Sequence, residues 1–99
     1  MFYRWGVDLC GPFQESSNGN HYIMVAIEHF SKHLELYPIP SKHAKYTAAA
    51  FADVNARYGA PAEVLTDQGS EFEGEFDALL LRCFIDHRRT SAITHKLMV

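Results

Sequence analysis

Thr66-Asp67-Gln68-Gly69-Ser70-Glu71-Phe72 lies between a short apolar run, Ala62 to Leu65, and the start of a helical pattern. The run predicts a strand over 62–66, which places Asp67 at the carboxyl end of that strand beside a glycine that lets the chain turn. Open α/β sheets gather their binding sites at this end of their strands. Asp67 is therefore a candidate site residue. The structural alternative is that it only caps the turn at Gln68-Gly69.

A second carboxylate falls within another strand pattern. Trp5-Gly6-Val7-Asp8-Leu9 belongs to a strand predicted over 2–10, which Gly11-Pro12 ends. A bare carboxylate in mid-strand is costly to bury, so a cation is expected near Asp8; the structural alternative is an ion pair with Arg4. Two carboxylates on strands of one sheet are suited to hold Mg²⁺ or Mn²⁺ over a phosphodiester.

The order of the predicted elements defines the fold class. Strands are predicted over 2–10, 21–29, 34–37, 62–66 and 84–87, with Pro38 ending the third. One helix is predicted from an N-cap at Ser41 to Tyr58, and another from a capping box of Ser70 and Glu73 to Cys83. Three strands followed by helix, strand, helix and strand predict an α/β fold, a mixed five-stranded sheet with helices on its faces. Apolar residues on both sides of 21–29 favour a sheet covered on both faces.

Composition limits the classes of function. The chain has 99 residues, 47% of them apolar, and a net charge of -3, which indicates one small globular domain and argues against binding of nucleic acid by bulk charge. We find no apolar run of membrane-spanning length and no signal peptide, so an intracellular protein that is not secreted is expected. Cys10 and Cys83 stand alone and predict reduced thiols. The spacing of His29 and His33 suggests a zinc site, but ordinary surface or core histidines are the favoured interpretation.

Several segments in order resemble the catalytic core of retroviral-type integrases, most closely those of gypsy-type LTR retrotransposons. The resemblance covers nearly all of residues 1–99 and rests on the aspartate segments together with Gly11-Pro12-Phe13, Asn18-Gly19-Asn20, Tyr22-Ile23-Met24-Val25-Ala26-Ile27, Tyr58-Gly59-Ala60-Pro61 and Thr90-Ser91-Ala92. It implies a ribonuclease H-like fold.

The resemblance also implies a chemistry. Asp8 and Asp67 would be catalytic and would ligate Mg²⁺ or Mn²⁺, which activates the attacking oxygen and stabilises the leaving 3′ oxygen in DNA 3′-end trimming and strand joining. The partners would be the element's DNA ends and target DNA, and a working integrase would be nuclear. Weaker nucleic-acid contacts are expected at Glu71, Arg88, Arg89 and Lys96. The structural alternatives are a helix-dipole role for Glu71 and a solvated basic tail for the other three.

One departure from the family pattern affects the expected activity. After Thr-Ser-Ala the family continues to His-Pro-Gln and then to a helix with a third catalytic acid. Here His95 is followed only by Lys96-Leu97-Met98-Val99. The expectation is a partial core domain, incomplete at its C-terminus, with little or no turnover, in which Glu28 and Glu35 are ion-paired or solvated rather than substitutes for the third acid. A non-catalytic scaffold domain that meets a partner or a second copy through Ile23, Val25 and Ile27 is the alternative.

Overall fold

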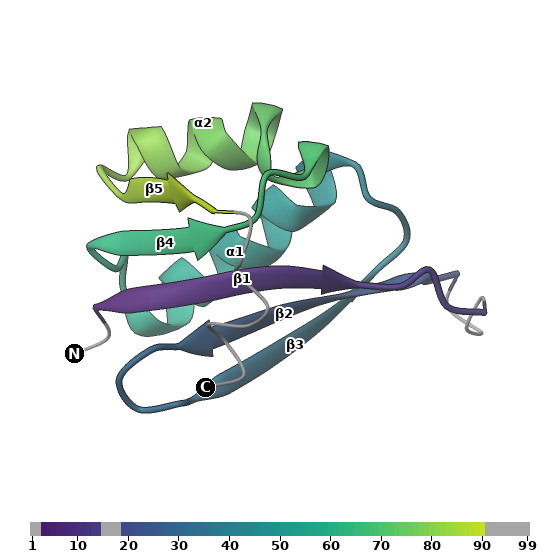
Figure 1. The fold of residues 1–99 in the computed structure, drawn as a ribbon, viewed down its shortest axis with the longest axis horizontal. Coiled ribbons are helices and arrows are strands. Elements are labelled where there is room, and N and C mark those ends of the chain that lie inside the picture. Colours follow the sequence, from purple (N-terminus) through teal and green to yellow (C-terminus); the bar gives the residue numbers. More distant parts are fainter. Residues whose placement is uncertain (1–2, 15–18, 91–99) are drawn as a thin grey trace.

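Five strands form one sheet in the order β3-β2-β1-β4-β5 (Figure 1). The structure is a computed structural model that describes residues 3–14 and 19–90. The strands are β1 (Arg4–Cys10), β2 (Tyr22–Glu28), β3 (Leu34–Ile39), β4 (Glu63–Thr66) and β5 (Asp86–Arg89). β2 pairs antiparallel with both β1 and β3, whereas β4 pairs parallel with both β1 and β5. The predicted mixed five-stranded sheet is confirmed.

Two helices pack on one face of this sheet. They are α1 (Ala44–Tyr58) and α2 (Gly74–Arg82), and a short 3₁₀ helix, η1 (Ser70–Phe72), precedes α2. Both helices lie on the same side of the strands in Figure 1. The core between the two layers contains alternate strand residues and the inner faces of the helices: Trp5, Val7, Met24, Ala26, Val64, Phe51, Val54, Phe72, Phe76 and Leu80.

The opposite face of the sheet has no cover from either described helix. Val25 lies opposite Asp8 in β1 and Leu36 in β3, and Ile27 lies opposite Leu34. Leu34 and Leu36 are 51% and 55% exposed. The expectation of cover on both faces is therefore not met within residues 3–14 and 19–90, because α1 and α2 share one layer.

The start of α1 differs from the prediction. The N-cap is His43, whose ring nitrogen Nδ1 accepts a hydrogen bond from the backbone N–H of Lys45 at 3.1 Å. Ser41 lies outside the helix, and its hydroxyl accepts from the backbone N–H of His43 at 3.3 Å. Ser41 thus orders the approach to the helix rather than its first turn. The predicted end at Tyr58 is confirmed, with Gly59 at a φ of 86° directly after it.

The start of α2 also differs. The predicted capping box of Ser70 and Glu73 is wrong, because Ser70 begins η1 and Glu73 becomes the N-cap of a helix that starts at Gly74. The Glu73 carboxylate binds Arg89 at 3.1 Å. The Glu73 side chain makes no capping hydrogen bond and pairs with β5 instead.

Two strand boundaries are corrected. β3 continues through Pro38 to Ile39, since proline is tolerated on an edge strand where alternate N–H groups point away from the sheet. β5 begins at Asp86 rather than Phe84, because Phe84 and Ile85 still close the end of α2: Ile85 donates its N–H to the Leu80 carbonyl at 2.9 Å. Among the described residues we find no helix long and apolar enough to cross a membrane.

Candidate functional site

The pairing of β1 with β4 sets the positions of the two candidate carboxylates. Trp5 lies opposite Val64 and Gly6 opposite Leu65 in a parallel register. Continuing this register by two residues brings Asp8 level with Asp67. Because parallel strands end at the same edge of a sheet, both aspartates belong to the edge where β1 and β4 terminate.

Asp8 lies on the sheet face opposite the helices. Trp5 and Val7 are buried under the helices, and side chains alternate along a strand, so Asp8 points to the other face, where it is partly exposed. Its Oδ1 accepts the backbone N–H of Leu9 at 2.8 Å. The alternative partner considered for it, Arg4, donates from Nε to Glu63 Oε1 at 3.0 Å.

Asp67 is the first residue after β4 and begins a tight turn. The N–H of Gly69 donates to Asp67 Oδ1 at 2.8 Å, which is the turn-capping role expected as the structural alternative. An ionised carboxylate has two oxygens and about four lone-pair directions, so this one bond is compatible with metal ligation by the same side chain.

A chain of polar contacts, partly buried at Thr66 and exposed at Asp77, holds the backbone of Asp67. The Thr66 hydroxyl donates to the Asp67 carbonyl at 2.9 Å and also contacts His87 Nε2 at 2.8 Å. The other ring nitrogen of His87 lies 2.8 Å from Asp77 Oδ1 on α2. Sequence reasoning missed His87 and Asp77, because only the pairing of β4 with β5 brings them to Thr66.

Glu71 is packed against the Asp67 turn rather than displayed on a helix surface. It is 8% exposed, and its backbone carbonyl accepts from the Thr47 hydroxyl at 2.6 Å. Its carboxylate oxygens lie 2.6 and 2.7 Å from the place that a Cβ at position 69 would occupy. Gly69 therefore lies against the buried carboxylate of Glu71. The suggested DNA contact of Glu71 stays a prediction.

The two adjacent arginines of β5 point to opposite faces and bind acidic residues of this chain. Arg88 Nε lies 2.7 Å from Glu63 Oε2 and 3.2 Å from Asp86 Oδ2. Arg89 Nη2 binds Glu73 Oε2 at 3.1 Å and the Gly69 carbonyl at 3.3 Å. Their nucleic-acid role stays a prediction, and Lys96 lies outside the described residues.

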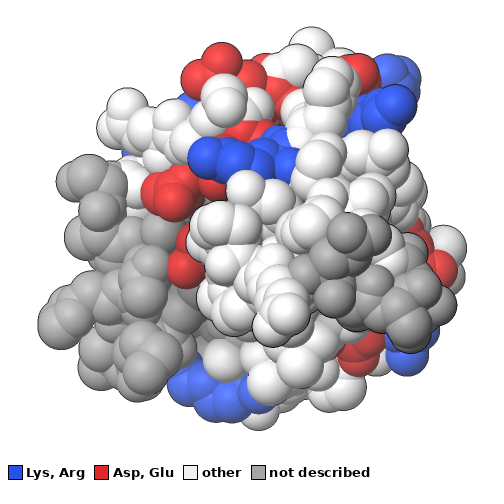
Figure 2. All heavy atoms as spheres, turned by 90° about the vertical axis from the view of Figure 1, so that its right-hand side faces the viewer, with Lys and Arg blue, Asp and Glu red and all other residues white. Residues whose placement is uncertain are grey.

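Charge at this edge is mixed. Figure 2 shows the side of the molecule toward which β1 and β4 run, with red and blue atoms interleaved among white ones on the described surface. Such a surface does not attract phosphates by a broad basic field. Binding of DNA at this edge therefore needs local groups or a bound cation.

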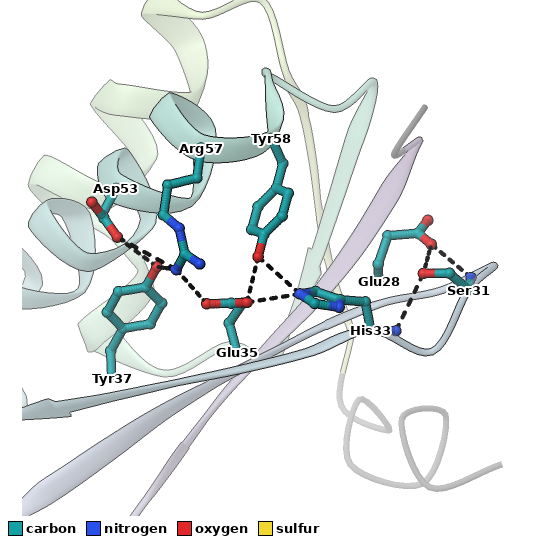
Figure 3. A network of polar contacts seen from close by, with 8 residues as sticks. All are labelled: Glu28, Ser31, His33, Glu35, Tyr37, Asp53, Arg57 and Tyr58. Atoms are coloured by element: carbon teal, nitrogen blue, oxygen red, sulfur yellow. Dashed lines mark hydrogen bonds and ion pairs between the residues drawn. The ribbon is translucent and has the colours of Figure 1, made fainter.

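Acidic residues of β2 and β3 have structural partners. Glu35 accepts the Tyr58 hydroxyl at 2.6 Å, contacts His33 Nε2 at 2.7 Å and binds Arg57 Nη1 at 2.6 Å (Figure 3). The Tyr58 hydrogen bond lowers the pKa of Glu35, burial opposes this, and His33 and Arg57 lower it further. Its expected ion pairing is confirmed.

Glu28 differs from what was expected. It is buried, and its Oε1 accepts both the backbone N–H and the hydroxyl of Ser31 at 2.7 and 2.8 Å (Figure 3). Burial alone raises the pKa of Glu28, but the hydrogen bonds from Ser31, together with those from the backbone of Phe30 and Tyr3, outweigh burial and bring the pKa to about 2. Glu28 is thus neither solvated nor dependent on an ion pair, because it caps the β2–β3 turn.

The donor set at the edge fits a hard divalent cation in kind. Asp8 and Asp67 supply carboxylate oxygens, which are the ligands that Mg²⁺ and Mn²⁺ prefer. Within residues 3–14 and 19–90 we find no group of three or more His, Cys, Asp or Glu side chains placed to hold a metal. The two aspartates therefore account for two ligands, with water and phosphate oxygens suited to the others.

Comparison with known sequences identifies a family. A model of the integrase core domain matches residues 1–95. The chain is 32% identical over 78 residues to the rat gypsy retrotransposon integrase-like protein 1, covering 79% of this chain and 15% of the rat protein. It is 38% identical over 73 residues to the Pol polyprotein of transposon 412 from Drosophila melanogaster, covering 73% of this chain and 6% of that polyprotein. The chain thus spans a small part of these relatives.

Comparison with solved structures agrees on the fold. The HTLV-2 integrase catalytic core domain, solved in complex with magnesium in a trimeric form, superposes with a TM-score of 0.78 at 19% identity. The superposition covers 95% of this chain and 63% of the viral chain. A dimeric form of the same viral domain gives a TM-score of 0.77. The predicted ribonuclease H-like architecture is confirmed.

Proposed function

This chain belongs to the integrase core domain family, and from that premise we propose that Asp8 and Asp67 form a divalent-metal site for polynucleotidyl transfer on DNA. The observation that supports the proposal is the parallel register of β1 and β4, in which Gly6 lies opposite Leu65. Extended by two residues, this register would set Asp8 level with Asp67. The integrase-type likeness of the whole chain supports the substrate class.

The two aspartates present their carboxylates from different kinds of backbone. Asp8 presents its carboxylate from the middle of a paired strand, so its direction is set by the sheet. Asp67 presents its carboxylate from a turn, where the Gly69 N–H holds one oxygen. A bound divalent cation supplies charge that stabilises the attacking and leaving oxygens of a phosphodiester. The DNA ends and target DNA are the proposed partners, and the nucleus is the proposed location.

The proposed turnover of this 99-residue chain is weak. Two carboxylates neutralise a single divalent cation, and within residues 3–14 and 19–90 no third acidic side chain is placed with them to hold a second ion. We expect metal binding without efficient strand joining. Mn²⁺-dependent joining of DNA by the purified chain at a rate typical of enzymes would contradict the proposed inactivity.

The experiment that tests the site is a thermal melt with and without Mn²⁺. A ligand that binds only the folded state at a hundredfold excess over its Kd adds about 2.7 kcal/mol to stability. We expect Mn²⁺ to raise the melting temperature of the parent chain and to lose this effect in Asp67→Asn. The matched control is Asp86→Asn, which removes an exposed carboxylate of β5 away from the site and should keep the Mn²⁺ response.

A second candidate function, a non-catalytic scaffold, is favoured by one observation. Leu34 and Leu36 are half-exposed on the sheet face that neither described helix covers. Apolar surface of this kind is typical of interaction sites. A cooperative melt with no Mn²⁺ response, together with a dimer or larger species by light scattering, would favour the scaffold. A monomer with a clear Mn²⁺ response would favour the metal site.

A further inference from the structure

We propose that Arg89 is a positioning residue that holds the turn presenting Asp67. The Nη2 atom of Arg89 donates to the Gly69 carbonyl at 3.3 Å and to Glu73 Oε2 at 3.1 Å. One guanidinium from β5 therefore connects the turn after β4 to the N-cap of α2. The side chain is 27% exposed, so these contacts are partly shielded from water.

The turn needs such a contact because its central residue is glycine. Glycine has the widest choice of backbone conformations and loses the most freedom when it is fixed. Alanine at position 69 would place its Cβ 2.6 Å from Glu71 Oε1, so the end of the Glu71 side chain would have to shift. A hydrogen bond from a cation to the Gly69 carbonyl compensates for this freedom.

Fixing Gly69 also fixes the carboxylate of Asp67. The carbonyl of Gly69 binds Arg89, and the N–H of the same residue donates to Asp67 Oδ1 at 2.8 Å. A rotation of the chain at Gly69 would move both groups. Arg89 thus acts on Asp67 through a single intervening residue and does not itself touch the proposed metal.

This role rests on the proposed metal site at Asp67. Residues that orient metal ligands from outside the coordination sphere change metal affinity by about 10- to 100-fold when they are mutated. We expect Arg89→Met to weaken Mn²⁺ binding by about 10-fold or more. Arg89→Lys, which keeps a positive charge within reach of Glu73, should recover part of the loss.

Arg88→Met is the matched control. Arg88 is the adjacent residue on β5, has the same side chain and makes two ion pairs of its own, with Glu63 and Asp86. It lies on the opposite face and does not contact the Asp67 turn through any described bond. Loss of a β5 arginine together with its ion pairing is therefore matched, whereas the contact with the Gly69 carbonyl is made by Arg89.

The experiment combines Mn²⁺ affinity, measured by electron paramagnetic resonance, with amide hydrogen exchange at Gly69 in metal-free protein. For Arg89→Met we expect weaker Mn²⁺ binding and faster exchange at Gly69, with both unchanged in Arg88→Met. For Arg89→Lys we expect an intermediate Mn²⁺ affinity and an intermediate exchange rate. This variant keeps the test informative if Arg89→Met folds poorly.

The outcomes separate this proposal from the one on which it rests. Equal Mn²⁺ affinity and equal Gly69 exchange in the Arg89 and Arg88 variants, with Mn²⁺ bound by the parent and lost in Asp67→Asn, would overturn the role of Arg89 alone. No Mn²⁺ binding by the parent, or unchanged binding in Asp67→Asn, would overturn the metal site and with it the positioning role. In that case faster exchange at Gly69 in Arg89→Met would show only that Arg89 stabilises the turn.

Discussion

Glu35 joins the edge strand β3 to the end of α1, and its charge is expected to stabilise the fold. Its pKa is lowered, first by the Tyr58 hydrogen bond and then by His33 and Arg57 against the effect of burial. A lowered pKa means that the folded state favours the ionised form. The stabilisation is therefore present at neutral pH and is lost as pH falls from the ordinary carboxyl range through the folded-state pKa.

Replacing this carboxylate tests the pH argument. Glu35→Gln should lower the free energy of unfolding by about 1–3 kcal/mol at pH 7, because a charged acceptor of three hydrogen bonds is lost. The difference from the parent should shrink toward pH 3, and urea unfolding at both pH values measures it. Glu75→Gln, at an exposed position of α2, is the control. A loss of stability of the same size at both pH values would contradict the role of the charge.

The predictability of the site depends on how each residue is positioned. The places of Asp8 within a strand and of Asp67 directly after a strand were predictable, because strand patterns and a turn glycine lie next to them in the sequence. His87 and Arg89 were not predictable in their observed contacts. Both act across the β4–β5 pair on partners about 20 residues away, Thr66 and Gly69. Pairing of β5 with β4, rather than any local pattern, brings these groups together.

At the scale of elements, the end of α2 is closed by a residue in an unfavourable conformation. Phe84 has a φ of 58° and donates its N–H to the Leu81 carbonyl at 3.2 Å, while Ile85 donates to the Leu80 carbonyl at 2.9 Å. These two bonds form a Schellman motif, in which glycine is the usual residue at the position of Phe84. The Phe84 side chain is 94% exposed, so it gains little from burial.

This conformation predicts a stabilising substitution. A left-handed conformation costs a residue with a Cβ about 1–2 kcal/mol, and glycine avoids this cost. Glycine also gives the unfolded chain more conformational freedom, which cancels part of the gain in stability. Phe84→Gly should therefore raise the free energy of unfolding by about 0.5–1 kcal/mol, measured by urea denaturation. Phe84→Ala keeps the Cβ and should not stabilise. A loss of stability in the glycine variant would mean that the Phe84 ring packs in solution.

Element boundaries were harder to predict than element types. Every predicted strand and helix is present, because its apolar spacing is set by contact with one core. The boundaries at Ser41, Ser70 and Phe84 were wrong. Two of them are set by other local contacts, the His43 cap at the start of α1 and the bonds from Phe84 and Ile85 that close α2. At Ser70 a tertiary contact is involved, because Glu73 is the N-cap of α2, makes no capping bond with its side chain and pairs with Arg89.

At the scale of the whole molecule, the mixed five-stranded sheet was predictable and the cover of the sheet was not. Three strands followed by strand–helix alternation leave few ways to build a mixed sheet. The apolar residues of β2 point to both faces, but within the described residues both helices pack on one of them. An apolar strand indicates that a face prefers cover, and it does not indicate which segment or partner provides it.

The overall charge leads to a test of how the molecule meets DNA. With a net charge of -3, the chain lacks the basic surplus that gives tight, salt-sensitive binding. We expect DNA affinity to depend on Mn²⁺ and to disappear in EDTA, with a shallow salt dependence whose logarithmic slope is about -1 to -2. Fluorescence anisotropy of a labelled DNA end over a salt series measures both the Mn²⁺ dependence and the salt slope.

The decisive variant is the double substitution Asp8→Asn with Asp67→Asn, which brings the net charge from -3 to -1. If bulk charge governed binding, this variant would bind DNA better than the parent. If a cation held by the two aspartates bridges to phosphate, the same variant binds worse in Mn²⁺, and the opposite signs of the two expectations make the result unambiguous.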